Sequence, residues 1–122
     1  MQRITNESRP HQPADDRNFV MPALTQRLLG GQEAQPVRLY RVTFREGART
    51  YWHRHDDVQL LFGISGACVV VNRDGDEMRL EPGDVVVIDP GEEHWHGAAP
   101  GSGGEHLAIN VGSETTWLES SA

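Results

Sequence analysis

The chain has 122 residues, which is enough for one domain around one core, and none of its apolar runs approaches the about 20 residues of a membrane span. A net charge of −7, carried with eleven arginines and no lysine, argues against nucleic acid as a partner and excludes a lysine Schiff base. The first twenty residues lack the apolar core of a signal peptide, so we expect a cytoplasmic protein whose partner is a small molecule.

The N-terminal part of the chain is polar and then becomes apolar. Residues 1–17 contain Pro10 and Pro13 with little apolar content, which predicts a flexible arm, and the barrel domain is expected to span residues 18–122. Residues 19–29 are ambiguous between a short helix and an edge strand, and the glycines that follow end this segment.

Two alternating segments come next and predict strands. In residues 37–45, one set of alternate side chains is bulkier and more apolar, so it is expected to face the interior. Residues 49–55 are predicted as a single strand with two faces. The bulkier set of the first segment is Arg38, Tyr40, Val42 and Phe44. The two faces of the second are Tyr51, His53 and His55 on one side and Thr50, Trp52 and Arg54 on the other.

Four side chains in this region and downstream are candidate ligands for one divalent metal. His53 and His55 are two residues apart and share a strand face, and Gln59 shares it if the strand resumes in register. His94 is the fourth candidate donor. An amide oxygen suits a hard or borderline metal such as manganese or iron. Because all four groups are neutral, they would leave the charge of the metal uncompensated and make it a stronger Lewis acid.

The remaining segments also predict short strands separated by turns. Residues 67–72 and 77–81 form a hairpin closed at Asp74 and Gly75, and residues 85–88 are expected to form a buried strand. Further strands are expected over residues 58–65, 105–111 and 115–118. Eight or more short strands without a long helical period predict an all-β, double-sheet jelly-roll barrel in a single domain.

Two further histidines are expected to enter the same cavity. His96 follows His94 by two residues, and His106 shares a strand face with Asn110. Either histidine is a candidate general base, because imidazole titrates near neutral pH. The alternatives are that His96 orients a metal ligand and that His106 makes a buried hydrogen bond. Residues expected to line the substrate pocket are Tyr40, Val42, Leu61 and Asn110.

The glycines, prolines and histidines also form two recognisable motifs. Gly47, His53, His55, Gln59 and Gly66 have the spacing of the first cupin motif, and the segment from Gly83 through Pro90-Gly91 to His94 resembles the second. Gln59 stands where cupins usually carry Glu, and the Asn that usually follows the second-motif histidine is absent. With the segment EHLAI at residues 105–109, the chain resembles small single-domain cupins that include bacterial manganese-dependent hydroxynitrile (mandelonitrile) lyases.

This resemblance implies a cupin double-stranded β-helix with an edge strand at residues 19–29. It implies one divalent metal, with Mn²⁺ as the first expectation and Fe²⁺, Ni²⁺ or Zn²⁺ as alternatives, held by His53, His55, Gln59 and His94. The implied reaction is a hydroxynitrile lyase reaction in which His96 or His106 moves the proton. A metal-dependent cupin dioxygenase and a non-catalytic small-molecule-binding cupin are the alternatives. Small cupins of this kind pair into homodimers or homotetramers, to which the tail at Trp117 is expected to contribute.

Overall fold

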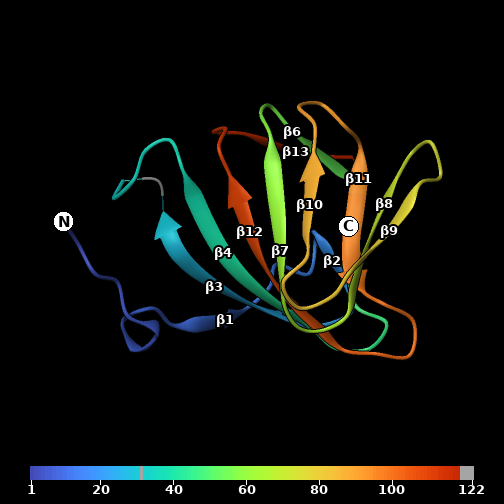
Figure 1. The fold of residues 1–122 in the computed structure, drawn as a ribbon, viewed down its shortest axis with the longest axis horizontal. Helices are drawn as coiled ribbons and strands as arrows, with labels where there is room; N and C mark the ends of the chain where they lie inside the picture. The colour runs from blue at the N-terminus through green and yellow to red at the C-terminus, as the bar shows by residue number, and fades with distance from the viewer. Residues whose placement is uncertain (31, 119–122) are drawn as a thin grey trace.

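The computed structural model describes residues 1–30 and 32–118, and its regular elements are short strands apart from one 3₁₀ helix (Figure 1). Gly31 and residues 119–122, which the predicted barrel domain includes, lie outside the described residues. The elements are η1 (Asn6–Ser8), β1 (His11–Pro13), β2 (Phe19–Val20), β3 (Ala23–Gly30), β4 (Arg38–Phe44), β5 (Arg49–Thr50), β6 (His53–His55), β7 (Gln59–Gly66), β8 (Cys68–Asn72), β9 (Glu77–Leu80), β10 (Val85–Ile88), β11 (His94–Ala98), β12 (Gly104–Asn110) and β13 (Thr115–Trp117).

The strands form two antiparallel sheets that face each other, as the sequence predicted. The first sheet has the order β1-β3-β4-β12-β7-β10. The second has the order β13-β6-β11-β5-β2, and β8 joins it by pairing with both β11 and β9. Crossovers between sequence-distant strands, such as β4 with β12 and β12 with β7, are typical of a jelly roll. Within the described ranges, the structure contains no helix with the length and apolar character to cross a membrane.

The core lies between the sheets and follows the alternation of the strands. Val42 and Phe44 of β4 are buried, as predicted for the bulkier set, and Leu61 and Leu80 pack with them. Residues 19–29 lie in the strands β2 and β3 rather than in a helix, but only β2 is an edge strand, because β3 pairs with both β1 and β4. The predicted hairpin of β8 and β9 is also present. These strands position the open end of the barrel where the predicted site residues meet.

Two local expectations were wrong. Residues 49–55 do not form one strand, because the chain leaves the sheet at Tyr51, whose N–H donates to the carbonyl of Asn18. The break rotates Thr50 to the inside, so it is buried on the same side as the histidines rather than opposite them. In β10, only Val86 and Ile88 are buried, because successive side chains alternate between the two faces and those of Val85 and Val87 point to the exposed outer face of the sheet.

The N-terminal residues contact the first sheet. β1 pairs with β3, and a proline at its end suits an edge strand because it has no N–H to donate. Gln26 is buried beneath the segment that precedes β1, and its Nε2 donates to Asn6 Oδ1 at 2.8 Å and to the carbonyl of Arg9 at 3.2 Å. The division into an arm and a barrel at residue 18 stays a prediction, although residues 11–13 extend the sheet.

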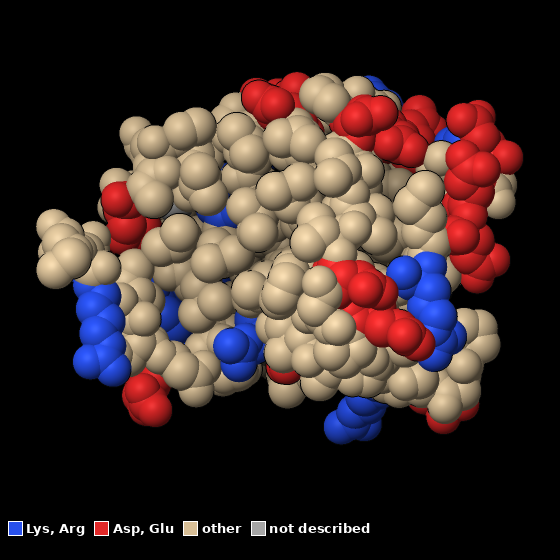
Figure 2. Space-filling model, in the orientation of Figure 1, with Lys and Arg blue, Asp and Glu red and all other residues tan. Residues whose placement is uncertain are grey.

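The outer face of the first sheet carries two cross-strand rows of apolar side chains. One row joins Leu29, Leu39, Ile109, Leu60 and Val87, and the other runs from Leu107 through Phe62 to Val85. Phe62, Val85 and Val87 are exposed. Figure 2 shows a wide area without charged side chains in the middle of the molecule, with acidic residues gathered along its upper and right margins. Exposed apolar patches of this kind mark association surfaces.

Candidate metal centre

The four predicted donors meet at one end of the barrel. β6 carries His53 and His55, β7 begins at Gln59, and β11 begins at His94, which is paired directly with His53. All four side chains are buried. The centroid of the His53 ring lies 4.3 Å from that of His94 and 5.0 Å from that of His55. Pairing between strands therefore assembles donors that come from three separate segments of the chain.

Hydrogen bonds at Nδ1 leave the Nε2 atoms of His53 and His94 without a hydrogen. His53 Nδ1 lies 2.8 Å from the carbonyl oxygen of Tyr51, and His94 Nδ1 lies 2.8 Å from that of Glu92. Because a carbonyl only accepts, Nδ1 carries the hydrogen in both rings and Nε2 keeps its lone pair. The Nδ1 atom of His55 contacts the Thr115 hydroxyl at 3.0 Å. Its Nε2 is buried without a hydrogen-bond partner among the described residues.

Burial keeps these imidazoles neutral. It lowers the pKa of His53 well below its usual value, and the neighbouring His94 adds to this effect. Burial is also the first cause that lowers the pKa of His94 and brings the pKa of His55 to about 4. A neutral imidazole is the form that ligates a metal, so no proton has to leave these rings near neutral pH.

Gln59 supplies the observation that tests whether a cation fits. Its Nε2 donates to Asn110 Oδ1 at 2.7 Å, so its Oε1 is turned toward His94, at 3.0 Å from Nε2. Both facing atoms are acceptors, and neither can donate to the other. With metal–ligand bonds of about 2.1 Å, two ligands at a right angle lie about 3 Å apart. The donor set therefore fits a divalent cation and leaves an unfavourable contact without one.

His96 and His106 form a second buried imidazole pair beside this cluster. His96 Nδ1 and His106 Nε2 lie 2.9 Å apart in a hydrogen bond. Burial lowers the pKa of both rings, that of His106 to about 4. One ring nitrogen from each of His53, His94 and His96 lies within 4.8 Å of the others. His96 is thus a further candidate ligand as well as a candidate base. The sequence alone did not indicate that His96 could be a ligand.

A cavity of about 230 Å³ opens onto this cluster. Of the predicted pocket residues, Tyr40, Val42 and Asn110 line it, whereas Leu61 lies wholly in the core. Among the predicted ligands and bases, His53, His55, Gln59 and His96 line the same cavity. His94 and His106 do not line this cavity, and His94 lines a separate hollow of about 30 Å³. The residues that share the lining with these are Phe19, Thr25, Arg38, Thr50, Ala108, Thr115 and Trp117.

Three of these further residues act on the site in ways that sequence reasoning missed. Thr115 holds Nδ1 of His55, and the Thr50 hydroxyl accepts from the backbone N–H of His96 at 3.2 Å. Trp117 packs its ring 4.5 Å from that of His53, which places it at the cavity wall. β13 carries Thr115 and Trp117 and pairs with β6, and the strand predicted over residues 115–118 did not indicate this contact.

Comparison with known proteins gives a consistent result. A family model described as "Cupin domain" matches residues 40–112. An (R)-mandelonitrile lyase from Granulicella tundricola is 45% identical over 82 residues, which cover 64% of this chain and 62% of that protein. The match thus spans less than two thirds of that relative's length.

Solved structures agree with the fold. A cupin-like protein from Thermotoga maritima superimposes with a TM-score of 0.83 at 31% identity, covering 90% of this chain and 86% of that one. A polyketide cyclase from Streptomyces resistomycificus superimposes with a TM-score of 0.80 at 17% identity, covering 97% and 85%. At that identity the second likeness concerns the fold alone.

Proposed function

The chain belongs to the cupin family, and from that premise we propose that it is a metal-dependent lyase that cleaves and forms small cyanohydrins. The similarity to an (R)-mandelonitrile lyase supports the substrate class. The observation that carries the proposal is the neutral donor cluster, with two acceptors 3.0 Å apart, beside the His96–His106 pair. We propose His53, His55, Gln59 and His94 as the ligands and manganese as the metal.

When bound, a divalent metal at this site supplies a Lewis acid that polarises an oxygen. Residues of the chain itself transfer the proton and hold the substrate. His96 lies within the cluster and accepts the hydroxyl proton of the cyanohydrin. The bond to the nitrile carbon breaks, its electrons leave with cyanide, and the proton is returned to give hydrogen cyanide and an aldehyde.

His106 supports this proton transfer from outside the cavity. Its Nε2 is hydrogen-bonded to Nδ1 of His96, which sets the orientation and the tautomer of that ring. Since burial lowers the pKa of both rings, His96 is unprotonated near neutral pH, which is the form that a general base needs. Val42 and Ala108 give the cavity an apolar wall that holds the substrate's carbon skeleton.

The experiment combines metal analysis with an assay of cyanide release from mandelonitrile. The purified protein should hold one metal per chain, identified by elemental analysis as manganese rather than iron, nickel or zinc. His94→Ala should lose the metal, whereas His11→Ala, which removes an exposed histidine in β1, should keep it. His96→Ala should lower turnover by about 10²–10⁴-fold.

Turnover should be equal under air and under nitrogen, because no step uses O₂. A protein that releases no cyanide from any cyanohydrin, or that turns over an aromatic diol only in the presence of O₂, would contradict the lyase proposal and favour the dioxygenase alternative.

A further inference from the structure

The cavity at the donor cluster is too small for most metabolite-sized ligands. Its volume is about 230 Å³, whereas pockets for such ligands usually measure about 300–1,000 Å³. Since a cavity of about 150 Å³ is enough for a benzene ring, this one holds a ring with one small substituent, and a larger substrate must extend beyond it. The remainder of such a substrate must occupy a neighbouring part of the surface.

A second hollow, of about 600 Å³, adjoins the first. Thr25 and Tyr40 line both. The pairing of β3 with β4 explains the continuity, because it places Thr25 opposite Val42 and Arg27 opposite Tyr40 on the inner face of the sheet. Val42 and Tyr40 are two residues apart, which is about 7 Å along a strand. Arg27 lies one such step along β3 from Thr25, which lines both hollows, and a para-disubstituted benzene ring is long enough to bridge this step.

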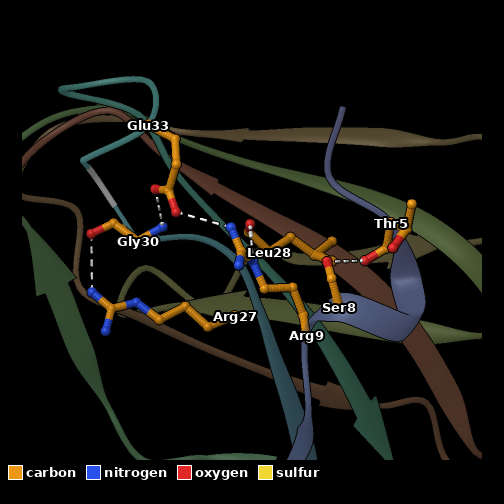
Figure 3. Close-up of polar contacts among 7 residues, drawn as sticks. All are labelled: Thr5, Ser8, Arg9, Arg27, Leu28, Gly30 and Glu33. Carbon is orange, nitrogen blue, oxygen red and sulfur yellow. Dashed lines mark hydrogen bonds and ion pairs between the residues drawn. The ribbon is translucent and has the colours of Figure 1, made fainter. Parts of the chain in front are cut away.

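Two arginines, Arg9 and Arg27, line the second hollow. Figure 3 shows both guanidinium groups against the backbone at the end of β3. Arg9 Nε donates to the carbonyl of Leu28 at 3.2 Å, and its Nη2 contacts Glu33 at 2.9 Å. Arg27 Nη2 donates to the carbonyl of Gly30 at 3.0 Å. These contacts use only some of the five N–H donors that each guanidinium group carries.

The side chains that line the two hollows carry a net positive charge, although the protein as a whole is acidic. Arg38 lines the first, held by two hydrogen bonds from Nε and Nη2 to the carbonyl of Gly112. Across both linings there are three arginines and one acidic residue, Glu33, in a chain of net charge −7. A concave surface of one sign attracts ligands of the opposite sign, and the planar guanidinium group matches a carboxylate.

We propose that the two hollows form one two-part site whose substrate carries a carboxylate at the end remote from the reacting carbon. The donor cluster takes the oxygen of the reacting group, the aromatic body passes Tyr40, and Arg27 with Arg9 binds the carboxylate. The assignment of the reacting end rests on the proposed lyase function, whereas the assignment of the arginine end rests on the second hollow alone. The substrate class is thus a small aromatic aldehyde or cyanohydrin with a para-carboxylate.

The test measures binding by calorimetry to the metal-loaded protein without any turnover. The probes are 4-carboxybenzaldehyde, its neutral analogue 4-formylbenzamide, and 4-formylphenyl phosphate. The carboxylate should bind about tenfold more tightly than the amide, as expected for a charge-assisted hydrogen bond, and the difference should shrink as salt is added. Equal affinities for carboxylate and amide would overturn the proposal, and tighter binding of the phosphate would overturn the choice of a carboxylate.

Two variants and a control locate the effect. Arg27→Gln should abolish the preference for the carboxylate, and Glu33→Gln should increase it, because it releases Arg9 from its ion pair. Arg45→Gln removes an exposed arginine outside both linings and should change nothing. A preference that persists in Arg27→Gln would refute the arginine site.

The failure of this proposal is distinguishable from the failure of the lyase proposal. A protein that prefers the carboxylate but releases no cyanide keeps the arginine site and loses the reaction. A protein that cleaves mandelonitrile but shows no preference for the carboxylate keeps the reaction and overturns the arginine site.

Discussion

Replacement of Asn110 by alanine should weaken metal binding although Asn110 is not a proposed ligand. Asn110 Oδ1 accepts the Nε2 hydrogen of Gln59 at 2.7 Å and so keeps Gln59 Oε1 facing His94. Without this acceptor, Gln59 Nε2 would be buried and unsatisfied, at a cost of about 1–3 kcal/mol. Rotation of the amide relieves this cost, because Nε2 can then donate to His94 Nε2.

The rotated amide occupies the lone pair of His94 and presents a donor where the cation needs an acceptor. Loss of such an orienting partner typically lowers metal affinity by 10–100-fold, which corresponds to about 1.4–2.8 kcal/mol. The metal-free variant should unfold at nearly the wild-type temperature, because the rotated amide is satisfied. The stabilisation that added metal confers should fall by the same free energy as the affinity.

Metal affinity can be measured by titrating Mn²⁺ against a competing chelator, and unfolding by calorimetry with and without metal. Asn110→Asp is the matched control, since a carboxylate still accepts from Gln59 Nε2 and should preserve metal affinity. Wild-type affinity in Asn110→Ala would refute the reasoning, and so would an equal loss in Asn110→Asp.

Three further predictions concern the barrel rather than the site. Burial raises the pKa of the Cys68 thiol to about 12, so maleimide at pH 8 should label it only after unfolding, and rapid labelling of the native protein would contradict this. Gly97→Ala should lower the unfolding temperature, because a Cβ at this position in β11 would collide with the backbone of Ala48, and such overpacking costs about 1–3 kcal/mol. The apolar rows on the outer face of the first sheet should bind the same face of a second copy, since a two-fold contact pairs identical patches. Phe62→Glu should therefore reduce the mass measured by light scattering, and a monomeric wild-type protein would exclude this interface.

Much of the strand arrangement could be predicted because side-chain alternation is a local property. His106 and Asn110 lie on the inner face of β12 as expected, and His53 and His55 share a face of β6. Predictions from side-chain alternation were wrong where a strand ended. The break at Tyr51 turned Thr50 inward, and no pattern within residues 49–55 indicated that Asn18 would bind that backbone.

The sequence by itself determined the fold class and the residue types that gather at the open end of the barrel. Two-residue periodicity, turn glycines and motif spacing are all encoded within a few positions of one another. Only the tertiary structure decided which atoms face each other. The orientation of the Gln59 amide depends on Asn110, 51 residues away, and the hollow containing Arg9 and Arg27 depends on the pairing of β1 with β3. Such contacts arise from the register and curvature of paired strands, which fix distances between segments that no local pattern connects.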